Sequence, residues 1–127
     1  MDSIVPGSLA YQQSLKISVV IPSFRVTAHV LTVVEGIGPE VSRIYVVDDY
    51  CPENSVKYLD SKIKKTKKIQ FVFLNKNNGV GGATLKGFKI AKKQGFNILL
   101  KFDSDNQHKV KDLSKIIKVL KNDDILF

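Results

Sequence analysis

The sequence has little cysteine, little histidine and no long hydrophobic run. Cys51 is the only cysteine among 127 residues and there are two histidines, which excludes an intramolecular disulfide and a thiolate-rich zinc site. No apolar run approaches the ~18 residues that span a bilayer. The N-terminus lacks the basic and then apolar order of a signal peptide. These absences predict a cytoplasmic protein, and any metal that it binds should be held by oxygen.

Arginine is also scarce, although the chain is rich in positive charge. The formal net charge is +8, and residues 57–121 hold 17 of the 18 lysines against four aspartates. Such a field favours anionic partners, among them nucleotides, phosphorylated lipids and an acidic membrane face. Arg25 and Arg43 are the only arginines, and arginine is the better side chain for reading bases, which argues against nucleic acid. A solvated set of lysine-rich helix faces explains the same charges without a partner.

Apolar β-branched runs alternate with helical patterns along a chain that is 43% apolar. This alternation predicts one α/β domain with a Rossmann-like, mostly parallel sheet of four to five strands and helices on both faces. The run 96–102 is nearly all apolar, so we expect it to lie centrally in the sheet. The predicted strands are 16–22, 43–49, 69–74, 96–102 and the beginning of a fifth at 123–127.

The helical patterns lie between the predicted strands. We expect helices at 26–36, after Pro52, after the glycine-rich segment that follows the third strand, and near the end of the chain. The third helix should bury Leu85, Phe88 and Ile90, turn its lysines outward and end at Gly95. The last helix has its apolar side at Leu113, Ile116, Ile117 and Leu120. Residues 1–15 are predicted to be a flexible leader and residues 16–127 the domain.

An acidic pair ends the second predicted strand. Asp48 and Asp49 follow IYVV, and alternation along a strand directs one of them to each face of the sheet. One carboxylate can accept hydrogen bonds from a base or a ribose, as acidic residues at strand ends do in nucleotide sites. Such pairs also start turns and cap helices, so this pair gains weight only if a second one lies at a neighbouring strand end.

Asp103 and Asp105 are that second pair, just past the fourth predicted strand. Ligands of an open α/β sheet bind beyond the carboxyl ends of its strands. A spacing of two residues in an extended segment points both carboxylates to one side. Two carboxylates with room for water and phosphates suit Mg²⁺ or Mn²⁺ bridging a diphosphate, and such a metal offsets the charge on a leaving nucleoside diphosphate. A solvated turn is the alternative interpretation.

The glycine-rich segment NNGVGGATLKG matches neither phosphate-binding fingerprint. Gly79 and Gly81 are followed by Thr84 where GxGxxG requires a third glycine, and the residue after Gly87 is not the lysine of a P-loop. The glycines either let the backbone approach a nucleotide, with Gly79 as the candidate contact, or pack a helix on a strand. The sequence leaves both interpretations open.

Three further side chains are weaker candidates. His108 is either a metal ligand or phosphate partner, or a surface histidine that begins a helix. Lys101 is either a phosphate contact or a strand-end lysine that reaches water. Cys51 has no base near it in the sequence, so we expect it to be inert.

Four motifs occur in order: ISVVIPSF, IYVVDDYCPENS, NNGVGGATLKGFKIA and ILLKFDSDNQH. Together they resemble the N-terminal half of family 2 glycosyltransferases, in the branch related to dolichol-phosphate mannose synthases. The resemblance covers residues 16–127. It implies a GT-A fold, a nucleotide-diphosphate sugar donor (a UDP-sugar or a GDP-sugar), a divalent metal and inversion at the anomeric carbon.

The resemblance also implies roles for single residues. Pro22 and Ser23 would line the donor pocket, and an aspartate of the Asp48 and Asp49 pair would bind the base. Asp103 matches the aspartate near the ribose and sugar, Asp105 matches the principal metal ligand, and Gln107 follows as it does in this branch.

The sequence departs from the family pattern in two places. Arg25 and Val26 stand where many relatives carry Asn-Glu. Ser104 stands between the two aspartates of the DSD motif, where glycine or alanine is common. The catalytic base is expected beyond Phe127, so the domain is predicted to stop before the acceptor half of the fold. An acceptor that is already an anion, such as a lipid phosphate, needs no base.

The sequence therefore predicts the donor-binding portion of an inverting glycosyltransferase. Its acceptor would be a polyprenyl phosphate or a surface polysaccharide, and the protein would act at the cytoplasmic membrane face, with peripheral association to anionic lipid. The alternative is a non-catalytic module that binds nucleotides or polyanions. A sugar nucleotidyltransferase is disfavoured, because its glycine-rich loop should follow the first strand and residues 22–30 contain no glycine.

Overall fold

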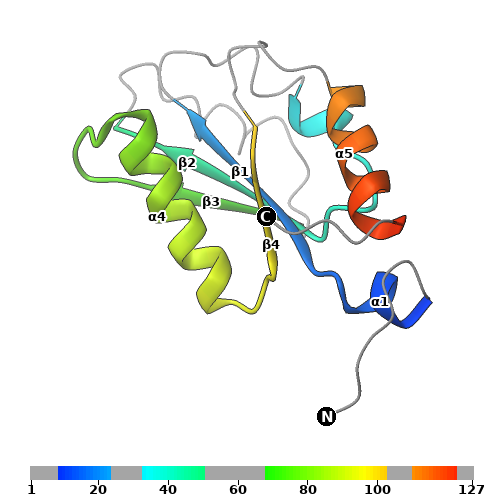
Figure 1. Ribbon diagram of the computed structural model, residues 1–127. Helices are drawn as coiled ribbons and strands as arrows, with labels where there is room; N and C mark the ends of the chain where they lie inside the picture. Colours follow the sequence, from blue (N-terminus) through cyan, green and yellow to red (C-terminus); the bar gives the residue numbers. More distant parts are fainter. Residues whose placement is uncertain (1–8, 24–32, 51–67, 103–109, 123–127) are drawn as a thin grey trace.

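A parallel sheet with helices on both faces forms the centre of the molecule (Figure 1). The computed structural model describes residues 9–23, 33–50, 68–102 and 110–122. The strands are β1 (Ile17–Ser23), β2 (Arg43–Asp48), β3 (Ile69–Phe73) and β4 (Ile98–Lys101), in the order β3-β2-β1-β4. The helices are α1 (Leu9–Ser14), α4 (Gly79–Lys93) and α5 (Val110–Asn122). The predicted α/β, Rossmann-like fold is confirmed.

The two central strands, β1 and β2, are buried along almost their whole length. Valine and isoleucine dominate both, as expected for parallel strands that are covered on two faces. Their register pairs Ser23 at the end of β1 with Asp48 at the end of β2. The last pair between β1 and β4 is Val20 with Lys101. Pro22 has no N–H to donate, and it lies beyond this last pair, so no hydrogen bond to β4 is lost.

Among the described strands, the fourth does not take the central position that was predicted. In the described sheet β4 lies at an edge and β1 takes the central place beside it. Residues 98–100 are half-buried rather than buried. An all-apolar run reports that both faces of a strand are covered, whereas a central position requires two paired edges, which the apolar pattern does not measure.

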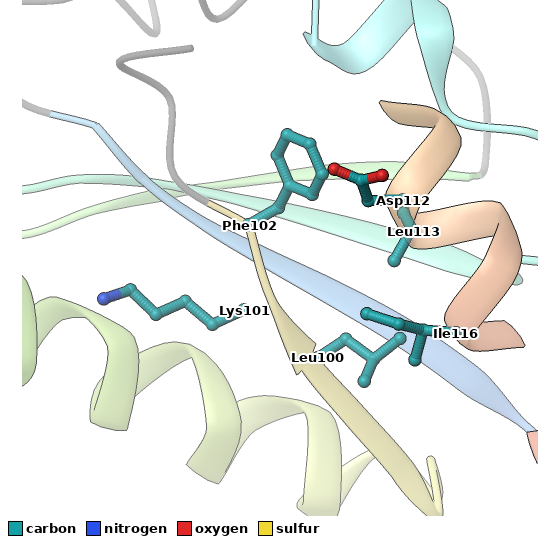
Figure 2. Close-up of a pocket in the computed structure, with 6 residues that line it drawn as sticks. All are labelled: Leu100, Lys101, Phe102, Asp112, Leu113 and Ile116. Atoms are coloured by element: carbon teal, nitrogen blue, oxygen red, sulfur yellow. The ribbon is translucent and has the colours of Figure 1, made fainter. Parts of the chain in front are cut away.

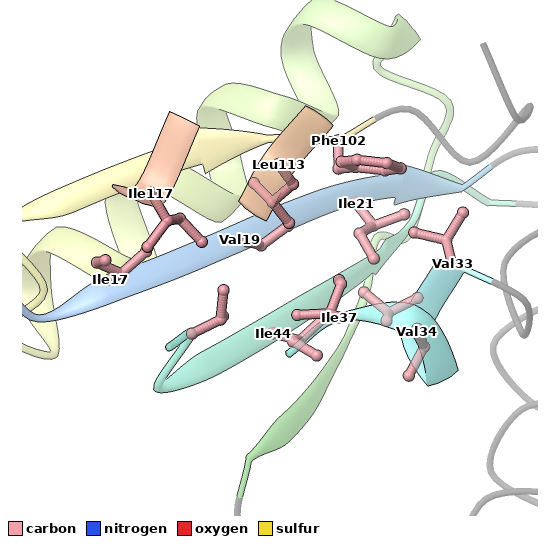
Figure 3. Packing of buried hydrophobic residues seen from close by; sticks show 12 residues of the cluster. Ile17, Val19, Ile21, Val33, Val34, Ile37, Ile44, Phe102, Leu113 and Ile117 are labelled. Atoms are coloured by element: carbon pink, nitrogen blue, oxygen red, sulfur yellow. The ribbon is translucent and has the colours of Figure 1, made fainter. Parts of the chain in front are cut away.

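Each face of the sheet has its own apolar cluster. Val20, Tyr45 and Val47 face α4, where they meet Ala83 and Ala91. The opposite face, shown in Figure 3, carries alternate residues of β1 and β2 and is covered by α5 and residues 33–37. That second cluster consists of Ile17, Val19, Ile21, Val33, Val34, Ile37, Val41, Ile44, Val46, Phe102, Leu113 and Ile117.

Helix α4 ends where predicted, but it already begins within the glycine-rich segment and it buries a different face. It begins at Gly79 and ends before Gly95, both of which have positive φ, 75° and 95°. Its buried residues are Ala83, Thr84, Gly87 and Ala91. Leu85 was predicted to be buried and is 52% exposed, whereas Phe88 and Ile90 are half-buried against the sheet. Small residues take the inner positions because the helix lies close to the strands.

In α5 the prediction holds for Leu113 and Ile117, which are buried, and is wrong for Ile116, which is 47% exposed. The side chain of Leu120 lies outside the described residues, as do most of the helix predicted at 26–36, the helix after Pro52 and the strand at 123–127. Residues 33–36 are helical. Within the segment 1–15, residues 9–14 form α1, and the flexibility of that segment stays a prediction.

A polar cluster joins the amino ends of the strands to the end of α4. The hydroxyl of Tyr45 donates to Oε1 of Gln94, and Nη1 of Arg43 donates to Oε1 of Gln70 at 3.1 Å. The guanidinium of Arg43 lies over the ring of Phe96 at 5.7 Å, and Phe96 meets Tyr45 edge to face. Among the described residues, Nε of Arg43 is a buried atom that makes no hydrogen bond.

Tyr45 should make the protein less stable in alkali. Burial raises the pKa of Tyr45 above its ordinary 10.0, and the nearby Arg43 offsets part of that rise. Because the folded-state pKa is raised, this stabilisation is complete below the unfolded pKa and is lost as the pH rises through the folded value. We expect Tyr45→Phe to cost about 1 kcal/mol at neutral pH and to flatten the loss of stability above about pH 10. Urea unfolding across that pH range tests this, and an unchanged alkaline slope would contradict it.

Candidate functional site

Three strand ends and the start of α4 meet at the carboxyl edge of the sheet (Figure 1). In the register, Ser23 of β1 lies beside Asp48 of β2, and Asp48 lies beside Phe73 of β3. The chain leaves β4 at the same edge through Phe102, whose N–H donates to the carbonyl of Val20 at 3.0 Å. The carboxyl edge therefore gathers the ends of the described strands and the residues that lead into α4.

Asp49 fixes the loop that leads into α4. Its side chain is 3% exposed, and its Oδ1 accepts the backbone N–H of Asn78 at 2.6 Å. Its own N–H donates to the carbonyl of Ser23 at 3.1 Å. Carboxylate-assisted hydrogen bonds of this length are among the stronger ones in proteins. Asp49 thus ties together β1, β2 and the segment before α4.

The alternation along β2 assigns Asp48 to the face opposite that of Asp49. It is 8% exposed, and it shares its face of β2 with Ile44 and Val46, whereas Asp49 shares a face with Tyr45 and Val47. The carbonyl of Asp48 accepts the N–H of Leu74 at 2.9 Å, which continues the pairing to β3. The two adjacent carboxylates therefore serve opposite sides of the sheet edge.

Pro22 and Ser23 end β1 and are both buried. Tyr50, directly after the acidic pair, has a φ of 57° and is 64% exposed. A left-handed conformation costs about 1 kcal/mol or more for a residue that carries a Cβ. The strained residue, Tyr50, is the one at which the chain turns away from Asp49.

The glycines of the glycine-rich segment serve different purposes. Gly79 has a positive φ, which allows the turn into α4, and its N–H donates to Oδ1 of Asn77 at 2.9 Å. Gly87 packs the helix on the sheet, because a Cβ there would overlap Cγ1 of Val20. The packing interpretation thus holds for Gly87, and the role of Gly79 as a nucleotide contact stays a prediction.

The predicted metal ligands lie outside the described residues. Asp103 and Asp105 fall there together with Ser104, Gln107 and His108. Within the ranges that the structure describes, no group of three His, Cys, Asp or Glu side chains is placed to hold a metal. The donor set itself, two carboxylates spaced by one residue, suits a hard divalent cation such as Mg²⁺ or Mn²⁺.

An apolar cavity of about 120 Å³ lies between α5 and the carboxyl end of β4 (Figure 2). Leu100, Phe102, Leu113 and Ile116 line it, with Asp112 at its side. Figure 2 shows Lys101 pointing away from this cavity, toward the side of α4. Among the described residues the lining of this cavity is mainly apolar.

A four-stranded parallel sheet with helices on both faces defines a Rossmann-like α/β protein, a class in which ligands bind beyond the carboxyl ends of the strands. The sequence profile described as "Glycosyl transferase family 2" matches residues 18–126. The chain belongs to this family, which confirms the predicted resemblance.

Two curated relatives carry functional names. The chain is 24% identical over 85 residues to an undecaprenyl-phosphate mannosyltransferase of Micrococcus luteus, which covers 67% of the chain and 35% of the relative. It is 29% identical over 120 residues to a UDP-N-acetylglucosamine–dolichyl-phosphate N-acetylglucosaminyltransferase of Methanococcus voltae, which covers 84% and 48%. The chain thus spans a third to a half of the length of these relatives. No helix in the described ranges is long and apolar enough to cross a bilayer.

Sequence reasoning missed one part of the site. Asn78 supplies the backbone N–H that Asp49 binds, and its side chain donates to the carbonyl of Lys76 instead of capping α4. The available signal was the Asn-Asn-Gly run, which is typical of a tight turn. The partner of that turn could not be identified, because it lies 29 residues away in the sequence.

Proposed function

We infer that this chain is the donor-binding portion of an inverting glycosyltransferase that passes a sugar from a nucleoside diphosphate to a polyprenyl phosphate. Membership of family 2 supports the reaction class. The names of two relatives, both of which act on a polyprenyl-type phosphate, support the acceptor. The single observation that carries the site is the carboxyl edge, where Ser23, Asp48 and the buried Asp49 meet.

In this proposal the residues of the chain have separate tasks. Asp48 or Asp49 accepts hydrogen bonds from the base or the ribose, and Pro22 and Ser23 form the floor of the donor pocket. Asp103 and Asp105 would hold Mg²⁺ or Mn²⁺, which supplies Lewis-acid stabilisation of the leaving diphosphate.

The transfer itself is a displacement at the anomeric carbon. A phosphate oxygen of the acceptor forms the new bond to that carbon, while the bond to the β-phosphate oxygen breaks and the nucleoside diphosphate leaves with the electron pair. Because the attacking oxygen is already anionic, no residue must remove a proton from it. A glycan hydroxyl would require a catalytic base, and none of the described residues has been assigned that role.

Asp105→Ala should abolish metal-dependent donor binding and leave the fold intact. Calorimetric titration of UDP-sugars and GDP-sugars, with and without Mn²⁺, measures this binding and shows whether the donor carries uracil or guanine. Asp112→Ala is the matched control, because it removes an exposed aspartate from the first turn of α5. Unchanged binding by Asp105→Ala would exclude the metal assignment.

The lysine-rich surface favours a second candidate function, a non-catalytic polyanion-binding module. Its motivating observation is α4, which carries four exposed lysines and no acidic residue. The same titrations separate the two functions. Binding that ignores Asp105 and weakens steeply with salt supports the module.

A further inference from the structure

On the outer face of α4, four positively charged lysines lie around an exposed leucine. We define this face as Leu85, Lys86, Lys89, Lys92 and Lys93. All five residues are exposed, and Leu85 keeps 52% of its surface accessible. The sequence from 74 to 97 contains no aspartate or glutamate, so no acidic neighbour along the chain offsets the four amines.

The helical repeat arranges this face as a stripe. Leu85, Lys89 and Lys92 are separated by four and three residues, which places them one above another. The other two lysines lie beside the stripe. The inner side of the helix, with Ala83 and Ala91, packs on the sheet, so the stripe lies on the side of the helix turned away from the sheet.

An anionic bilayer complements both properties of the stripe. Lysine lays its alkyl stem along apolar surface and holds its amine at the level of the lipid phosphates. Leucine inserts into the region below, as the apolar residues of interfacial helices do. Nucleic acid would gain from the charges alone and would leave Leu85 in water.

We propose that the outer face of α4 docks this protein on an anionic lipid bilayer. The helix then lies along the membrane surface, and its first residue, Gly79, lies at the carboxyl edge of the sheet beside Asp49, because the N–H of the adjacent Asn78 binds that carboxylate. The donor site opens at the level of the lipid head groups. Docking is a property of this surface alone, whereas its use in reaching a lipid phosphate rests on the proposed function.

Helix α5 is the competing surface and also the internal control. It exposes Ile116 and Val119 beside Lys115 and Lys118. It lies on the opposite face of the sheet, so α4 and α5 cannot both lie flat on one membrane (Figure 1). Its exposed first turn also carries Asp112, which an anionic surface repels.

The experiment is co-sedimentation of the 127-residue chain with phosphatidylcholine vesicles that contain or lack phosphatidylserine, without donor or metal. Lys89→Gln with Lys92→Gln should weaken binding about 25-fold, from about fivefold for each lysine near an anionic surface. Lys115→Gln with Lys118→Gln removes the same net charge from α5 and should change binding by less than about twofold. Leu85→Gln should weaken binding about tenfold.

Three results would overturn the proposal. They are binding that does not depend on phosphatidylserine, equal losses from the α4 and α5 pairs, and an unchanged affinity after Leu85→Gln together with competition by duplex DNA. The last result would assign the face to polyanions in general. Asp105→Ala should bind the vesicles as the unaltered chain does, so a failure of the donor site and a failure of docking are seen separately.

Discussion

Replacing Gly87 with alanine should lower the free energy of unfolding by about 1–2 kcal/mol. The new Cβ would overlap Cγ1 of Val20 and lie 3.1 Å from its Cγ2 and 3.2 Å from Cγ2 of Val47. Both valines are fully buried in central strands, so neither can move aside and the helix must shift. Overpacking of this kind costs about 1–3 kcal/mol, and the better helix propensity of alanine returns up to about 1 kcal/mol.

Gly81→Ala is the matched control for this substitution. A Cβ at Gly81 would meet no atom within 4 Å, and Gly81 lies in the same helix without a positive φ. Here only helix propensity changes, so we expect an increase of up to about 1 kcal/mol. Urea unfolding followed by circular dichroism compares the two variants. The close contact of α4 with the sheet is refuted if both substitutions change stability in the same direction.

The close approach at Gly87 explains why the buried face of α4 could not be read from hydrophobicity. The apolar pattern assigned Leu85 to the interior, but the space beside β1 and β2 admits only small side chains such as Ala83 and Ala91. The volume available between helix and sheet decided the orientation. That volume depends on strands that are distant in the sequence, so a local pattern does not contain it.

The strands and their order of appearance were predictable for a simpler reason. Continuous β-branched runs are typical of strands covered on both faces, and β1 and β2 are buried in this way. The place of Asp48 and Asp49 at the carboxyl edge followed from the same runs. The contact of Asp49 with the N–H of Asn78 could not be predicted from these runs, because it depends on how the loop after β3 returns to the sheet.

Asp49→Ala is the second substitution for which we expect a large effect. It would leave the half-buried N–H of Asn78 without its acceptor, and a hydrogen bond to a charged group contributes about 1.5–3 kcal/mol of stability. It would also release the segment before α4 from the carboxyl edge. Asp112→Ala, on the exposed turn of α5, should stay within about 0.5 kcal/mol of the unaltered protein. Thermal or urea unfolding measures both, and equal effects would contradict the structural role of Asp49.

Asp49→Asn separates this structural role from a role in binding. Asparagine keeps an oxygen that can accept the N–H of Asn78, so we expect a loss of only about 1 kcal/mol of stability. If Asp49 binds the base or ribose of the donor, this variant should remain folded and still bind the donor less tightly. If donor affinity is unchanged while Asp49→Ala is unstable, Asp49 only supports the site. Asp48, on the other side of the same strand end, would then be the carboxylate that meets the nucleotide.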